Sequence, residues 1–176
     1  SPVPRYTSYP TALEFAPLGD EALLDSYRQC EPGRPVSVYI HLPFCENLCL
    51  YCGCNVLLSR KKGVLDDYIP LLLREIEIKT DMMEFRPRVS QLHFGGGTPN
   101  FLRLADWDAI FSRLHERFEF THDAEISAEF DPMYLEPGYL EHLRSLGLNR
   151  VSYGVQDVTP QVLEAVNRPQ DIARIK

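Results

Sequence analysis

The chain has 176 residues, a formal net charge of −7 and a sequence pI of about 5.2. Hydrophobic residues make up 44% and charged residues 24% of it, a balance typical of a globular protein and not of a disordered one. The acidic balance argues against a general binder of nucleic acid or anionic membranes. No apolar run approaches the roughly 18 residues that indicate a membrane span.

Residues 1–35 are rich in proline and aromatic side chains and form the first expected region. Residues 5–11 (RYTSYPT) are predicted to be an extended arm, and a short helix is expected over 20–29, before the breaker EPGRP at 31–35. The region has no charged-then-apolar signal peptide, which favours a reducing, cytoplasmic location.

From residue 36 onward, short apolar strands alternate with amphipathic helices. Strands are expected at 36–42, 89–94, 124–130 and 150–155, and helices at 66–85, 106–118, 137–147 and from Pro160 onward. This alternation predicts βαβ units around a parallel sheet, an α/β fold. The chain stops where a fifth strand would be due and lacks an initiator methionine. We therefore expect a fragment of a longer protein, in which residues 36–176 form the first part of a larger domain.

Each expected strand has one apolar face and one polar face. A closed eight-stranded barrel fills its interior with bulky branched residues, so the polar faces favour a wider or incomplete barrel that holds a ligand. The alternative, an open sheet with one wet face, is unusual for parallel strands. Five polar-face side chains are expected to line one cavity: Tyr39, His41, His93, Glu129 and Gln156. Five apolar ones are expected beneath helices: Val38, Ile40, Leu92, Ile126 and Val155.

Four of the five cysteines (Cys45, Cys49, Cys52 and Cys54) lie within ten residues, directly after the first expected strand. Structural zinc usually takes two separated ligand pairs, so zinc is the weaker alternative. Closely spaced thiolates are typical ligands of iron–sulfur clusters. A cluster held by three thiolates leaves one iron open for a small molecule.

The spacing Cys45-x3-Cys49-x2-Cys52, with Tyr51 before the third cysteine, resembles the cluster loop of the radical S-adenosylmethionine (SAM) superfamily. Residues 38–55, the stretch QLHFGGGTP at 91–99 and the arm at 4–12 are similar to the oxygen-independent coproporphyrinogen III oxidases, also called coproporphyrinogen dehydrogenases. The likeness spans nearly the whole chain. It implies a partial (βα)6 TIM-like barrel, of which this chain would hold the first four βα units behind an N-terminal arm.

The resemblance also implies two kinds of cofactor site. Cys45, Cys49 and Cys52 would bind a 4Fe–4S cluster whose open iron takes SAM. Residues matching three family positions would serve that SAM: Tyr39, Gly96 and Glu129. A second SAM would lie near five others: Tyr51, Gly97, Thr98, Gln156 and Arg168. Structural roles stay open as alternatives. The glycine run can form only a flexible turn, and Glu129 can pair with a basic side chain.

The implied activity is that of an oxidoreductase of anaerobic haem (porphyrin) biosynthesis. A 5′-deoxyadenosyl radical made from SAM would abstract hydrogen from propionate groups of coproporphyrinogen III. Loss of CO2 and one electron from each of two propionates would give the vinyl groups of protoporphyrinogen IX. The implied partners are coproporphyrinogen III and an electron donor for the cluster, and neither nucleic acid nor a membrane span is expected. Arg5 and the run at 60–62 are candidates for binding substrate carboxylates. A related haem chaperone is the alternative, and Cys54 and the arm favour the enzyme.

Overall fold

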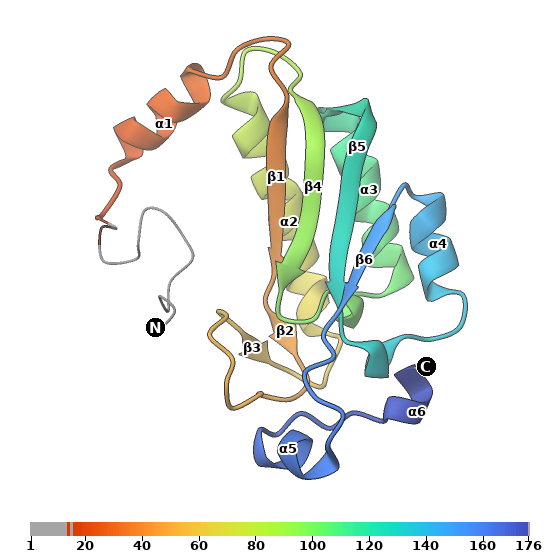
Figure 1. The fold of residues 1–176 in the computed structure, drawn as a ribbon. Coiled ribbons are helices and arrows are strands. Elements are labelled where there is room, and N and C mark those ends of the chain that lie inside the picture. Colours follow the sequence, from red (N-terminus) through yellow and green to blue (C-terminus); the bar gives the residue numbers. More distant parts are fainter. Residues whose placement is uncertain (1–13, 15, 176) are drawn as a thin grey trace, which may run out of the picture.

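The computed structural model describes residue 14 and residues 16–175. The expected arm lies outside the described residues. In the described part a parallel sheet carries helices on one face, as Figure 1 shows. None of the described helices combines the length and apolarity that crossing a membrane requires.

Four strands form the sheet in chain order: β1 (Val36–Leu42), β4 (Arg88–Gly96), β5 (Glu119–Phe130) and β6 (Arg150–Tyr153). All neighbouring pairs are parallel, with Tyr39 opposite His93 and Glu129 opposite Ser152. Because each new strand joins beside the previous one, the sheet grows in one direction, as in a TIM-like barrel. The predicted α/β class and partial barrel are confirmed.

Three helices connect these strands: α2 (Val64–Asp81), α3 (Leu104–Arg117) and α4 (Tyr139–Ser145). Helix α1 (Asp20–Arg28) precedes the sheet, and α5 (Pro160–Ala165) and α6 (Ile172–Ile175) follow it. Two very short strands, β2 (Phe44–Cys45) and β3 (Leu57–Leu58), pair in parallel outside the main sheet. Two 3-10 turns lie at Pro99–Phe101 and Pro132–Tyr134.

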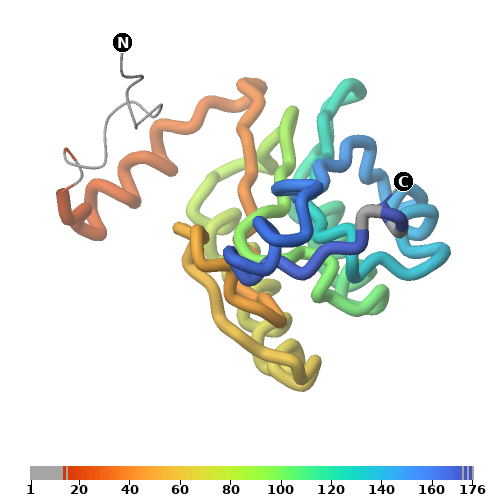
Figure 2. The backbone as a smooth tube through the Cα atoms, turned by 60° about the horizontal axis from the view of Figure 1, so that its bottom comes forward, coloured from red at the N-terminus to blue at the C-terminus, as the bar shows by residue number. Residues whose placement is uncertain are grey.

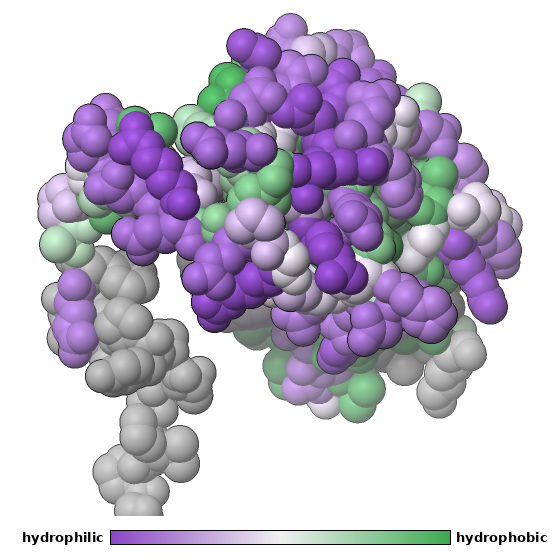
Figure 3. Space-filling view, turned by 90° about the horizontal axis from the view of Figure 1, so that it is seen from above, coloured by the Kyte–Doolittle hydropathy of each residue, from purple (hydrophilic) through white to green (hydrophobic). Residues whose placement is uncertain are grey.

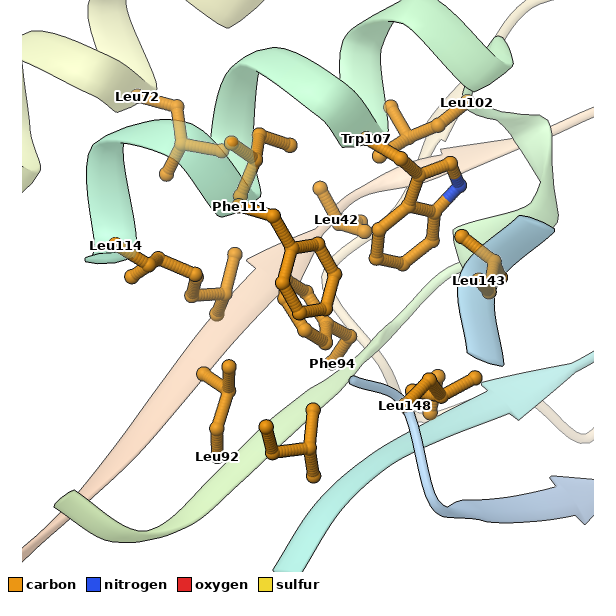
Figure 4. Packing of buried hydrophobic residues seen from close by; sticks show 14 of the residues in the cluster. Leu42, Leu72, Leu92, Phe94, Leu102, Trp107, Phe111, Leu114, Leu143 and Leu148 are labelled. Atoms are coloured by element: carbon orange, nitrogen blue, oxygen red, sulfur yellow. The ribbon is translucent and has the colours of Figure 1, made fainter. Parts of the chain in front are cut away.

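The apolar core lies between the sheet and helices α2 and α3 (Figure 4). Trp107 and Phe94 are fully buried, with ring centroids 4.8 Å apart in an edge-on arrangement. The Trp107 indole N–H donates to the Tyr139 hydroxyl, and that hydroxyl donates to the Leu102 carbonyl. Burying these rings supplies the apolar stabilisation, while the hydrogen bonds satisfy the polar tips that burial would otherwise penalise.

Most expected element bounds agree with the structure, and the differences have local causes. Strand β1 has the predicted bounds, whereas β5 begins at Glu119 because Glu119 and Phe120 pair with the start of β4. Helix α4 begins at Tyr139 and not at Pro137, because Gly138 has a left-handed φ of 82°. Helix α2 ends at Asp81, four residues before the predicted end.

The predicted division of the strand faces is confirmed for Val38, Ile40, Leu92 and Ile126, which lie in or against the helix-covered core. It is wrong for Val155, which is 42% exposed because β6 already ends at Tyr153. Among the described residues, no helix covers the opposite, polar face of the sheet (Figure 1).

Candidate active site

A cavity of about 330 Å³ lies at the carboxyl ends of the strands. Its walls come from the loop after β1, the turn after β4, the ends of β5 and β6, and the segment after α5. Figure 2 brings this end forward and shows the blue segment after β6 crossing the strand ends. The amino ends, by contrast, present a mostly hydrophilic surface (Figure 3). Loops at the carboxyl ends of parallel strands are where ligand sites of such folds are built.

The cysteine-bearing loop (residues 45–56, here called the cysteine loop) begins at Cys45, the last residue of β2. Its base is closed by β3, because Leu57 N–H donates to the Pro43 carbonyl at 2.6 Å and Ser59 N–H donates to the Cys45 carbonyl at 2.9 Å. Within the loop, Cys52 N–H donates to the Cys49 carbonyl at 3.0 Å. The two ends of the cysteine loop are therefore hydrogen-bonded to each other, and the loop lies at the carboxyl ends of the strands.

Two of the cysteine sulfurs have polar neighbours from distant parts of the chain. Cys45 Sγ lies 3.5 Å from Thr98 Oγ1, and an Arg168 guanidinium N–H donates to Cys49 Sγ at 3.6 Å. Burial raises the pKa of the Cys45 thiol, whereas the Thr98 hydrogen bond and the Arg168 charge act in the opposite direction. A cation beside a sulfur favours the thiolate, which is the form that binds metal.

Three cysteine side chains around one cavity supply the thiolates that an iron–sulfur cluster takes as ligands. Cys45, Cys49 and Cys52 all line the cavity, and all five cysteines are unpaired. A cluster is bound by thiolates at separate irons, so its ligands surround a larger volume. The donor set and the cavity therefore fit such a cluster.

The glycine turn after β4 is bound to the backbone that leads into the cysteine loop. Gly97 N–H donates to the Leu42 carbonyl and Thr98 N–H donates to the Phe44 carbonyl, both at 2.8 Å. An added Cβ at Gly97 would lie 2.6 Å from the Phe44 carbonyl oxygen. Gly96 has a φ of 112°, which side chains rarely adopt. The left-handed φ of Gly96 and the close backbone approach at Gly97 therefore account for these two glycines before any ligand is considered.

Tyr39 and His41 lie on the uncovered polar face of the sheet, beside the cysteine loop. The Tyr39 hydroxyl lies 3.0 Å from His41 Nδ1, and His41 Nε2 lies 2.9 Å from the Asn55 carbonyl. Since a carbonyl only accepts, this network assigns the proton to Nε2 and makes Tyr39 the donor to Nδ1. Burial, followed by the nearby Glu129 and Cys54, raises the pKa of Tyr39, so the phenol keeps the proton that it donates.

His93 connects this face to the cavity. Its Nε2 lies 3.5 Å from Glu129 Oε1 and its Nδ1 lies 2.8 Å from Ser127 Oγ. Glu129 itself lines the cavity. The histidine therefore lies between a buried serine and the carboxylate at the cavity edge.

A buried ion pair supports the opposite wall. Arg168 and Asp131 are 2.8 Å apart, with side chains only 15% and 7% exposed. Arg168 also donates to the Gly154 carbonyl at 3.1 Å. Asn100 donates to the Asp131 carbonyl and accepts from its N–H, which ties β5 to the turn after β4. Sequence reasoning gave Asp131 and Asn100 no role, because such contacts between distant segments leave no local pattern.

Comparison with known proteins agrees with this architecture. The profile of the Radical SAM superfamily matches residues 39–176, which is most of the chain and includes every side chain of the cavity. The chain belongs to the radical SAM superfamily. This membership implies a 4Fe–4S cluster and SAM as cofactors.

Individual radical SAM relatives are similar over nearly all of this chain. It is 47% identical over 169 residues to an oxygen-independent coproporphyrinogen III oxidase of Escherichia coli K12, and 38% identical over 179 residues to one of Synechocystis. These alignments cover 96% and 98% of the chain but only 36% and 38% of the relatives. A solved E. coli coproporphyrinogen III oxidase, described as a radical SAM enzyme, matches with a TM-score of 0.89 and 45% identity. That match covers 97% of this chain and 39% of the solved one.

The structure gathers the residues that the radical SAM resemblance singled out. All of those assigned to the cluster or to SAM line the cavity, except Tyr39. Tyr39 is 57% exposed on the open face. The expectation that Tyr39, His41 and His93 share one cavity with Glu129 and Gln156 is wrong, because the cavity lies beyond the strand ends while these three side chains stand on the sheet. The ligand roles themselves stay predictions.

Proposed function

We propose that this chain carries the cluster- and SAM-binding part of an oxygen-independent coproporphyrinogen III oxidase. Such an enzyme converts two propionate groups of coproporphyrinogen III to vinyl groups and yields protoporphyrinogen IX. The observation that carries the proposal is the gathering of three cysteines, the glycine turn, Glu129 and Arg168 around one cavity. The relatives of that name support the choice of substrate.

Cys45, Cys49 and Cys52 are the proposed cluster ligands, and Cys54 is not one. The sulfur of Cys49 is backed by the Arg168 guanidinium, which stabilises negative charge on the thiolate. Cys54, unlike these three cysteines, does not line the cavity. Five unpaired cysteines suit a reducing compartment, which supports the cytoplasm as the location.

The first SAM is proposed to contact Tyr39, Gly96 and Glu129. A carboxylate only accepts hydrogen bonds, so Glu129 suits paired ribose hydroxyls. The side chain of Glu129 is 60% exposed toward the cavity and the open face, and is therefore accessible to a ligand. When bound, the cluster and SAM supply the radical that removes a hydrogen atom from the propionate.

A second SAM is proposed near five residues of the same cavity: Tyr51, Gly97, Thr98, Gln156 and Arg168. Arg168 is the cation best placed there, since its side chain is mostly buried and Asp131 holds it. The run at 60–62 contributes less than its charge suggests. The Lys62 ammonium lies 4.4 Å from the centre of the Phe101 ring and donates to the Phe101 carbonyl, so it is occupied within the protein. Arg5 lies outside the described residues.

Anaerobic reconstitution of the intact protein with iron and sulfide tests the proposal. With an electron donor, SAM and coproporphyrinogen III, it should form 5′-deoxyadenosine and a divinyl product. A haem chaperone would bind porphyrin without forming that product. Iron content should collapse when Cys45, Cys49 or Cys52 is changed to serine and persist in Cys54→Ser. Equal iron loss in all four variants would show that the ligand assignment is wrong.

A further inference from the structure

We propose that Asn167 is a positioning residue that holds Cys49, the second of the three proposed ligand cysteines, in place. The proposal rests on the assignment of Cys45, Cys49 and Cys52 as cluster ligands. Asn167 Nδ2 donates to the Leu48 carbonyl at 2.7 Å, across 119 residues of sequence. The contact joins the segment after α5 to the loop.

Cys49 is fixed on both sides by this segment. The carbonyl before it, that of Leu48, accepts from Asn167, and the N–H after it, that of Leu50, donates to the Val166 carbonyl at 3.0 Å. The Cys49 sulfur itself accepts from Arg168 at 3.6 Å. Three consecutive residues, 166–168, thus contact three consecutive residues of the loop, 48–50. Cys52, by contrast, is exposed, and its N–H donates within the loop, to the Cys49 carbonyl.

The conformation of Asn167 makes this contact possible. Asn167 is the only described non-glycine residue with a positive φ, at 52°. Asparagine tolerates the left-handed region better than most residues, and such a residue commonly ends a helix. The turn aims the amide back across the helix end toward the loop.

The holding segment is itself anchored. Leu163 in α5 is only 3% exposed, and its carbonyl accepts from Arg168 N–H at 2.8 Å. The Arg168 side chain is held by buried Asp131 and by the Gly154 carbonyl. A support that is anchored in this way can restrict the loop, whereas a mobile tail could not. We infer that it pre-orients Cys49 for the cluster and slows cluster release.

Two variants separate the amide from the backbone turn in the intact, reconstituted protein. Asn167→Gly keeps the left-handed turn and removes the amide. Asn167→Asp keeps the shape but places a carboxylate oxygen against the Leu48 carbonyl. Gln161→Ala, on the exposed side of α5, is the matched control. The readouts are the rate of iron loss to a chelator, the EPR spectrum of the reduced cluster and the thermal midpoint.

Loss of one hydrogen bond should speed iron release in Asn167→Gly about three- to tenfold, and Asn167→Asp should exceed that. Both should alter the EPR line shape, while Gln161→Ala matches the wild type. Wild-type release rates and spectra in Asn167→Gly, at an unchanged thermal midpoint, would overturn the proposal. If Asn167→Asp fails to fold, Asn167→Gly still decides. If the wild-type protein binds no cluster, both the proposed function and this inference fail. If it binds a cluster and Asn167→Gly behaves like the wild type, only this inference fails.

Discussion

Replacing the three consecutive glycines after β4 with alanine, one at a time, tests how the cavity wall is built. At Gly95 the added Cβ would lie 3.1 Å from Tyr39 Cε2 and 3.2 Å from His93 Nε2. Both neighbours are side chains on the open face and can move slightly. We expect Gly95→Ala to lower the free energy of unfolding by about 1 kcal/mol.

At Gly96 two penalties combine. The φ of 112° is strained for a side chain, at a cost of about 1–3 kcal/mol, and the Cβ would lie 2.7 Å from the His41 ring. Moving that ring breaks its hydrogen bonds to Tyr39 and Asn55, each worth about 1 kcal/mol. The expected loss is about 3–5 kcal/mol. Because Asn55 belongs to the cysteine loop, Gly96→Ala should also disturb the cluster, so it is no clean test of SAM contact.

At Gly97 the obstacles are backbone atoms. The Cβ would lie 2.6 Å from the Phe44 carbonyl oxygen and 2.8 Å from the Pro43 carbonyl carbon. Relief would require breaking the two hydrogen bonds that join Leu42 and Phe44 to the turn. We expect the largest effect here, at least about 4 kcal/mol or failure to fold.

Urea and thermal unfolding of the intact protein, followed by circular dichroism, should rank the variants Gly95, Gly96, Gly97 in increasing order of damage. A Gly95→Ala variant as unstable as Gly97→Ala would refute the reasoning, because it would mean that the turn is not built against the β1–β2 backbone.

Three further variants test other parts of the site. Glu129→Gln keeps the shape but loses the charge, so SAM affinity should fall about tenfold at unchanged cluster absorbance, measured by anaerobic titration. Asp131→Asn leaves the Arg168 guanidinium poorly paired, and urea unfolding should show a loss of about 3 kcal/mol. Tyr68→Phe removes the hydroxyl that donates to the His41 carbonyl at 2.6 Å, and should cost about 1 kcal/mol at pH 8. Burial raises the pKa of Tyr68 from 10.0 to about 12, so this contribution is complete below pH 10 and is lost as pH rises through 12.

Each of these three predictions has an outcome that would contradict it. Glu125→Gln is the control for Glu129, since Glu125 lies on the same strand face but pairs with Arg150 at 2.9 Å. Equal SAM affinity in both variants would remove Glu129 from the ligand set. An Asp131→Asn loss below about 1 kcal/mol would mean that solvent already screens the pair. A Tyr68→Phe difference that persists unchanged at pH 12 would contradict the sign of the pKa shift.

The sequence predicted the strands of the sheet well, because the alternation of apolar and polar residues that marks a strand lies within a few consecutive residues. Strand β1 alternates apolar and polar residues between Pro35 and Pro43, and its bounds agree with the structure. The faces also followed from this period of two. The predicted end of β6 is too late because Val155 continues the alternation in sequence, while the backbone turns around Gly154, where Val155 N–H donates to the Tyr153 carbonyl at 3.0 Å.

The walls of the cavity were harder to predict, because they depend on contacts between distant segments. Nothing near Asn167 in the sequence indicates that its amide reaches Leu48, and nothing near Asp131 indicates Arg168. The cysteine spacing identified the ligand loop. It did not indicate that β3 closes the base of that loop, since two leucines give no clear strand signal.

The cavity and the open polar face meet at Glu129, and this junction bears on how a large substrate would fit. Glu129 lines the cavity, and its carboxylate lies 3.5 Å from His93 on the open face. Parallel sheets rarely leave one face uncovered, so we expect the polar face to be covered in the intact protein or to border a bound ligand. The cavity of about 330 Å³ is at the lower end of ligand-pocket sizes. A ligand larger than this cavity would extend past Glu129 onto the polar face, over Tyr39, His41 and His93.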